Sequence, residues 1–146
     1  PENVFVATFM GSPAMNVMSA RVKVIDGAPH ASLPDADGQE VLLKFAQPNL
    51  AAWDGKSILL GIRPEAITDP DGADRNSKNI VPLRNRIGVT EPAGADTYVT
   101  MTLSGKDAIG RMRADAQVRA GELFDFAVNM DKAVAFDPET EMRIKP

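Results

Sequence analysis

The chain has 146 residues, no cysteine, a net charge of −4 and 25% charged residues. Its length suffices for one domain or two small packed ones, and the lack of cysteine excludes disulfides and thiolate metal sites. The acidic balance leaves no broad basic surface, so we expect no nucleic-acid partner. No apolar run approaches the roughly 20 residues that cross a bilayer, and no signal peptide is recognisable. We therefore expect a soluble, cytosolic chain.

The first segment has helical periodicity. Within residues 2–10, Phe5 and Phe9 are four positions apart and so share one side of a helix. Gly11 suits the position just after a helix, and Pro13 blocks its continuation. We predict one short N-terminal α-helix, with Phe5 and Phe9 as core anchors rather than a partner surface.

The remaining sequence alternates between apolar and polar residues. Eleven glycines and eleven prolines punctuate it, and four Asp-Gly pairs are suited to tight hairpin turns. The polar stretch 68–79 has no period and is predicted to be a loop that divides the chain into two unequal halves. About eight short strands predict a mostly β fold, a barrel or sandwich. The predicted strands are residues 18–24, 41–45, 58–62, 83–90, 97–103, 109–113, 123–128 and 133–136.

Motifs that would carry catalysis are incomplete. Residues 55–57, Gly-Lys-Ser, match the end of a phosphate-binding loop, but Leu50 occupies the place of its first glycine and an apolar strand follows instead of a helix. His30 is the single histidine and lies beside Pro29 in a turn-like stretch, so we expect a surface or strand-edge side chain. We predict no catalytic residue, no bound cofactor and no metal in this chain.

Two other patterns have more than one explanation. Residues 35–38 and 69–72 resemble calcium loops, but the glycine comes too early and no glutamate follows at the twelfth position, so turns are favoured. Four arginines on two strand faces could form an anion site, and exposed arginines beside acidic neighbours explain them equally well. These arginines are Arg84, Arg86, Arg111 and Arg113.

Two sequence runs are specific in combination. The first is FVATFMGSPAMN at residues 5–16, and the second is LGIRPE at residues 60–65. EPAGADT at 91–97 and FDPET at 136–140 give further matches. Together these runs resemble the C-terminal regulatory region of the ATPase subunits of carbohydrate and glycerol-phosphate ABC importers, the MalK/UgpC type. The motif residues are Gly11, Ser12, Pro13, Met15, Asn16, Gly61, Ile62, Arg63, Pro64 and Glu65.

The resemblance implies an OB-fold-like β-barrel of the transport-associated (TOBE) type. It places an OB-like regulatory domain at residues 14–146, with two intertwined halves divided near residues 68–79, and a helix at residues 1–13 that leads out of a missing ATPase core. The Walker motifs of such proteins lie in that core, so ATP and Mg²⁺ are expected there. Family members often carry His or Asp after the LGIRPE run, and Ala66 removes any polar role at that position.

The resemblance also implies a function and partners. The domain would be noncatalytic and would form a homodimer with the same domain of a second subunit, while the ATPase core contacts the membrane permease subunits. Some members also receive a regulatory protein. The implied location is the cytoplasm, at the inner face of the cell membrane.

Other interpretations remain open at this stage. For the motif residues we favour structural roles, with Gly61 permitting a close backbone approach and with Arg63 and Glu65 making local hydrogen bonds. The alternative function is a stand-alone OB-type module that binds a small oxyanion through the arginine pairs. A small free-standing enzyme is the third possibility.

Overall fold

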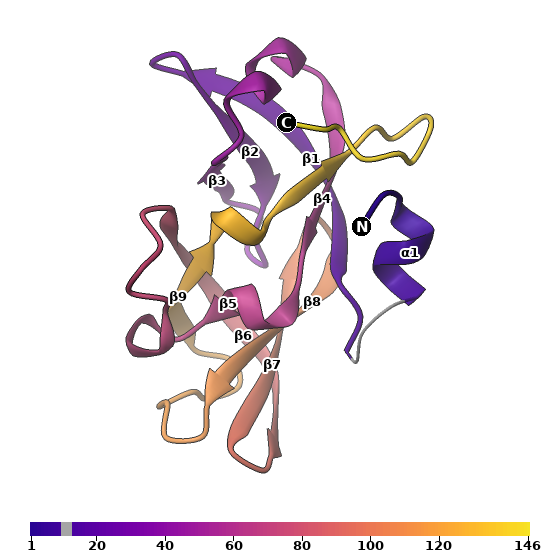
Figure 1. Ribbon diagram of the computed structural model, residues 1–146. Coiled ribbons are helices and arrows are strands. Elements are labelled where there is room, and N and C mark those ends of the chain that lie inside the picture. Colours follow the sequence, from indigo (N-terminus) through magenta and orange to yellow (C-terminus); the bar gives the residue numbers. More distant parts are fainter. Residues whose placement is uncertain (10–12) are drawn as a thin grey trace.

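The computed structural model describes residues 1–9 and 13–146 and contains two antiparallel five-stranded sheets (Figure 1). The helix α1 (Val4–Phe9) lies beside the first sheet. That sheet contains β1 (Asn16–Ile25), β2 (Ala28–Pro34), β3 (Glu40–Lys44), β4 (Ser57–Ile62) and β10 (Val134–Phe136), in the order β10-β4-β1-β2-β3. The second sheet contains β5 (Ile67–Thr68), β6 (Ile80–Ala93), β7 (Asp96–Leu103), β8 (Lys106–Arg113) and β9 (Leu123–Asn129), in the order β5-β9-β6-β7-β8.

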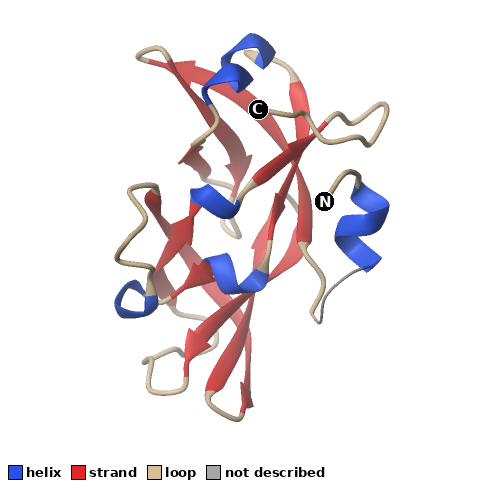
Figure 2. Cartoon of the chain, viewed as in Figure 1, coloured by secondary structure: helices blue, strands red, loops and turns tan. Residues whose placement is uncertain are grey.

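Short 3-10 helices connect the strands (Figure 2). They are η1 (Pro48–Trp53), η2 (Pro64–Ala66), η3 (Pro70–Gly72) and η4 (Met130–Lys132). The chain leaves the first sheet after β4, builds the second sheet and returns with β10, so η2 and η4 carry the two crossings. The domain limits inferred from the resemblance stay predictions.

The mostly β fold with one short N-terminal helix is confirmed. Each of the eight predicted strands has a counterpart, and the described residues also contain β2 and the two-residue β5. His30 was placed in a turn-like stretch, which is wrong, because it lies half-buried in β2 between β1 and β3. Alternation in β2 buries Pro29 and Ala31, two residues with weak strand signals.

Two hairpins depend on residues with positive φ. Asp26 and Gly27 join β1 to β2 with φ of 52° and 80°, as the predicted Asp-Gly turn requires. Ser104 and Gly105 join β7 to β8 with φ of 53° and 75°. Both turns therefore have the left-handed backbone that suits the twist of the flanking strands.

The second sheet curls until its outer strands β5 and β8 come into contact. Gly110 in β8 marks the approach, since a Cβ atom there would lie 2.9 Å from Met112 Cε and 3.0 Å from the Ile67 carbonyl oxygen. The missing side chain thus allows the strands to close on one another as in an OB-type barrel.

The main apolar core lies between the two sheets and takes residues from both, including Leu60, Leu83 and Phe126. A smaller core lies under α1, where Ala7 packs with Met15 and Phe136.

The predicted role of Phe5 and Phe9 as core anchors is wrong, because they are 71% and 73% exposed. Their rings stack on each other with centroids 5.5 Å apart. The small side chain of Ala7 faces the sheet instead and brings the helix close to it.

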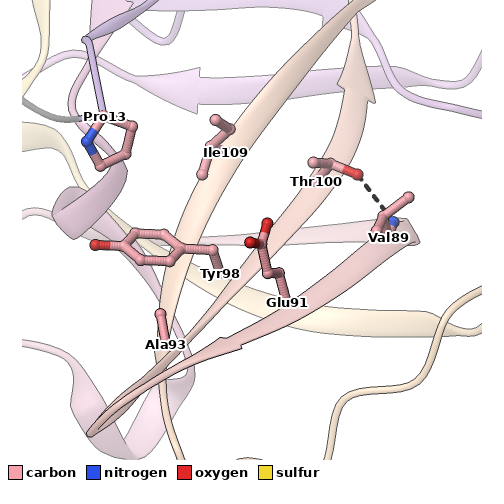
Figure 3. A pocket seen from close by; sticks show the side chains of 7 residues that line it. All are labelled: Pro13, Val89, Glu91, Ala93, Tyr98, Thr100 and Ile109. Atoms are coloured by element: carbon pink, nitrogen blue, oxygen red, sulfur yellow. Dashed lines mark hydrogen bonds between the residues drawn. The ribbon is translucent and has the colours of Figure 1, made fainter.

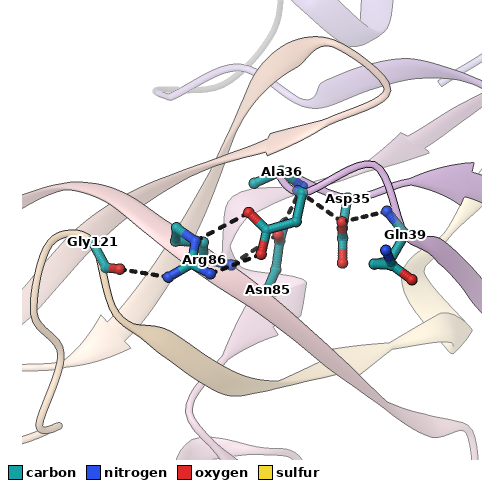
Figure 4. A network of polar contacts seen from close by, with 7 residues as sticks. Asp35, Ala36, Gln39, Asn85, Arg86 and Gly121 are labelled. Atoms are coloured by element: carbon teal, nitrogen blue, oxygen red, sulfur yellow. Dashed lines mark hydrogen bonds and ion pairs between the residues drawn. The ribbon is translucent and has the colours of Figure 1, made fainter.

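Asn85 joins the two sheets by a buried side-chain amide (Figure 4). Its Oδ1 accepts from Ala36 N at 3.0 Å, and its Nδ2 donates to Thr102 O at 3.0 Å, while only 1% of the residue is exposed. Arg86 next to it donates to both carboxylate oxygens of Asp37 at 3.1 and 2.8 Å. The β2–β3 turn is therefore attached to β6 and β7.

We expect Asn85→Ala to lower the free energy of unfolding by about 1–3 kcal/mol, because two backbone groups in a buried setting lose their partner. Urea denaturation near neutral pH measures the change. Asn49→Ala is the matched control, since the exposed Asn49 amide donates to Lys145 O at the surface, and its effect should stay below about 0.5 kcal/mol. Equal losses in the two variants would contradict the assignment.

Candidate functional site

The two motif runs meet where β1 begins and β4 ends. Asn16 is the register partner of Ile62 in the β1–β4 pair, although the two runs are far apart in the sequence. We call Met15, Asn16 and residues 61–65 the motif corner. Of the other motif residues, Gly11 and Ser12 lie outside the described residues.

Gly61 sits at the most crowded point of the motif corner. A Cβ atom there would lie 2.7 Å from Met15 Sδ, 2.9 Å from Phe136 Cε2 and 3.0 Å from Val134 Cγ2. We predicted a close backbone approach at Gly61, but the atoms that crowd it belong to side chains of β10 and of the residue before β1. Any larger residue would push these groups out of the small core below α1.

Asn16 connects the motif corner to the second sheet. Its Nδ2 donates to Ile109 O at 2.9 Å, and its Oδ1 accepts from Ile109 N at 2.8 Å. The amide acts as one further backbone unit beside β8, and the residue is only 9% exposed. Sequence reasoning found Asn16 through the motif but missed this role, because its partner is 93 positions away.

Pro64 begins the short helix η2, which turns the chain from β4 towards β5. Ile62 and Pro64 are buried, whereas Arg63 and Glu65 are half-buried. No side-chain hydrogen bond of Arg63 or Glu65 is found within residues 1–9 and 13–146, so the local bonds expected for them are not observed. Glu65 Oε1 is buried there without a hydrogen-bond partner.

Glu65 borders a cavity of about 150 Å³, which we call the Glu65 cavity. Its lining comes from η2, β5, the segment after η3, β6, β8, β9 and η4. Thr68, Asn129, Arg111 and Lys132 add polar and cationic groups beside the carboxylate of Glu65. Both crossings between the sheets therefore contribute to one small polar space.

Asp69 fixes the segment that forms one wall of this cavity. Its side chain is 5% exposed, and its carboxylate accepts hydrogen bonds from Arg113 N at 3.0 Å and Nε at 2.9 Å. Arg113 Nη2 also forms an ion pair with it at 2.8 Å. Burial acts to raise the pKa of Asp69, but the hydrogen bonds from Arg113 outweigh it and hold the pKa below its usual value. Asp69 therefore stays ionised to a lower pH than an unperturbed aspartate side chain.

Most of the predicted arginine pairs have acidic partners. Arg84 pairs with Asp125, Arg86 with Asp37, and Arg113 with Asp69. Arg111 instead lines the Glu65 cavity. The Asp-rich stretch at 35–38 forms a turn, and the stretch at 69–72 contains the 3-10 helix η3. The described part of the chain contains no cluster of three potential metal ligands. The explanation by acidic neighbours thus holds for three of the four arginines.

A second hollow lies on the outer face of the β6–β7 hairpin (Figure 3). It measures about 320 Å³, and its lining includes Pro13, Val89, Tyr98 and Ile109. A bulge in β6 turns Val89 outward, with its N–H bonded to Thr100 Oγ1 at 2.9 Å and the residue 63% exposed. We call this surface the hairpin hollow.

Comparisons with known proteins show what the chain and its fold are similar to. The family model described as the MalK OB fold domain matches residues 11–67, which include the whole motif corner. The chain is therefore similar to the MalK OB fold domain over these residues. The oligosaccharides import ATP-binding protein MsmX of Bacillus subtilis is 34% identical over 148 residues, covering 99% of the chain and 38% of that relative.

Two other relatives are also named as ATP-binding proteins of import or transport systems. The sn-glycerol-3-phosphate import ATP-binding protein UgpC of Chromobacterium violaceum is 33% identical, covering 99% of the chain and 36% of that relative. The sulfoquinovosyl glycerol transport ATP-binding protein SmoE of Agrobacterium fabrum is 31% identical over 99% of the chain and 37% of its own length. The chain thus spans little more than a third of these relatives, and they confirm the resemblance indicated by the motif runs.

A solved structure of the cytoplasmic molybdate-binding protein ModG has a related fold. It superposes with a TM-score of 0.53 at 14% identity, covering 84% of this chain and 96% of the ModG chain. This likeness concerns the fold alone. No helix among the described residues has the length and apolar character to span a bilayer.

We expect Asp69→Asn to destabilise the fold by about 1–3 kcal/mol near neutral pH, because Arg113 loses a charged partner. The pKa of Asp69 is lowered below 3.8 in the folded state, so its contribution is full above that pH and is lost as the pH falls through the folded value. The difference between wild type and variant should therefore shrink in acid. Urea titrations at several pH values measure it.

The matched control is Asp125→Asn, which removes a carboxylate from the exposed pair with Arg84. Its effect should be below about 1 kcal/mol at any pH, since exposed ion pairs contribute little. A difference for Asp69→Asn that stays constant down to acid pH would contradict the pKa assignment.

Proposed function

We propose that the chain is a noncatalytic regulatory and dimerisation domain of an ABC importer ATP-binding subunit for carbohydrate or sn-glycerol 3-phosphate. The observation that carries this proposal is the similarity to import ATP-binding proteins over 99% of the chain but only 36–38% of their length. The remaining part of such a subunit would bind ATP and Mg²⁺ and hydrolyse the nucleotide. No cofactor, metal or catalytic residue is assigned to this chain.

The proposed mechanism is a coupling between domain pairing and the ATPase cycle. A domain that favours one arrangement of the two ATPase cores by about 1–3 kcal/mol would shift activity without touching nucleotide. Asn16 and Asn85 support such a role, because their buried amides join the two sheets. A movement of one sheet would then be transmitted to the other sheet through these hydrogen bonds.

The proposed pairing surface is the hairpin hollow. The exposed Val89 and the half-buried Tyr98 provide apolar and aromatic area of the kind that dominates protein interfaces. A stable homodimer buries roughly 1,200 Å² or more in total, so the neighbouring strands would also take part.

Further partners follow from the proposed role. Permease subunits would be reached through the ATPase core, and a regulatory protein could bind in some settings. The location would be the cytoplasmic face of the cell membrane.

The alternative function, an oxyanion-binding module, has weaker support. Three of the four arginines that could bind an anion are already paired with carboxylates. An oxyanion would have to compete with these charges, and the ModG likeness speaks only for the fold. We therefore favour the regulatory domain.

The pairing can be tested by a light-scattering concentration series on the 146-residue chain. We expect the mass to approach that of a dimer, and Val89→Asp to weaken association tenfold or more, because a charge would be buried at the interface. Leu123→Asp is the matched control, since Leu123 is an exposed strand residue outside the hairpin hollow and should leave association unchanged. A chain that stays monomeric at high concentration would count against independent dimerisation.

A further inference from the structure

The Glu65 carboxylate is not explained by any contact within the described residues. Its Oε1 is buried and has no hydrogen-bond partner there. A buried polar atom without a partner is rare in folded proteins and costs more when it is charged. Glu65 also borders a cavity, so a molecule bound there would lie beside its carboxylate group.

The lining of the Glu65 cavity carries unpaired charges of both signs. Glu65 and Asp74 bring two carboxylates, and Arg111 and Lys132 bring two cations. None of these four side chains is in an ion pair within residues 1–9 and 13–146, although other charged residues of the chain are paired. The formal charge of the lining is zero, so a ligand with one net charge would meet repulsion as well as attraction.

The cavity also limits the size of a ligand. Its volume of about 150 Å³ corresponds to roughly five water molecules at about 30 Å³ each. A molecule of about five to seven non-hydrogen atoms would fill it. The hydroxyl of Thr68 and the amide of Asn129 are further polar groups in the lining.

We propose that the Glu65 cavity binds a small zwitterion that carries an ammonium and a carboxylate, with the size of glycine or L-serine. The ammonium donates hydrogen bonds to Glu65, and the carboxylate pairs with Arg111 and Lys132. This site is independent of the proposed pairing surface, because the two share no lining residue.

Titration calorimetry of the 146-residue chain with glycine and with L-serine tests the proposal. We expect saturable binding that Glu65→Gln and Arg111→Gln each weaken tenfold or more, because each loses a charged hydrogen bond. Acetate and methylammonium should bind at least tenfold more weakly, since each satisfies only one end of the site. Glycerol distinguishes a polyol site from a zwitterion site and should not bind.

The matched control is Glu139→Gln, the same substitution at an exposed carboxylate outside the cavity, which should leave binding unchanged. Circular dichroism checks that every variant is folded, and Arg111→Gln keeps the test decisive if Glu65→Gln fails to fold because Arg111 is exposed. The absence of saturable heat up to about 10 mM ligand would overturn the proposal. Binding that both variants leave intact, or equal binding of acetate or glycerol, would overturn it as well.

Discussion

Two hydrogen bonds between the Asn16 amide and the Ile109 backbone hold the two sheets together. They attach the start of β1 to β8 and so set how the first sheet sits on the second. The Asn85 amide likewise forms hydrogen bonds to both the β2–β3 turn and β7. Because an amide buried without partners is costly, only a placement of the sheets that satisfies both amides is stable. The apolar core alone would tolerate sliding, since apolar contact has no direction.

Most strands were predictable from the sequence, because a period of two is a local property of five to ten residues. The β2 strand was missed where Pro29 and His30 interrupt that pattern, although Pro29 is buried next to a hairpin. Periodicity also placed Phe5 and Phe9 on one side of a helix without showing which side faces the protein. The helix instead packs on the sheet through the small Ala7, since a close approach to Phe136 needs a small side chain.

The motif residues could be found by resemblance, but their contacts could not. Asn16 reaches a partner 93 positions away, and Asp69 reaches Arg113 across 44 positions. Such pairs depend on the complete topology of both sheets. The charged residues of the Glu65 cavity are still harder to group from the sequence. Most of them lie in η2, β8 and η4, which are far apart in the chain and come together only in the complete fold. Sequence reasoning assigned a local hydrogen bond to Glu65, but no such bond is observed among the described residues, although side chains with donor groups line the same cavity.

Residues 62–65 of the motif corner therefore have two roles, one in the crossing between the sheets and one in the lining of the Glu65 cavity. Ile62 and Pro64 are buried and fix the crossing from the first sheet to the second, while Glu65 directs a carboxylate oxygen into the interior at that crossing. A ligand held between Glu65 and Lys132 would connect the outgoing crossing η2 with the returning crossing η4. It would stiffen the junction between the sheets. Such a ligand would shift the equilibrium between two conformations of the domain only as far as it binds one of them more tightly than the other. A small molecule bound at this junction would thus shift the balance between conformations of the domain, and through it the arrangement of the ATPase cores that the domain is proposed to control.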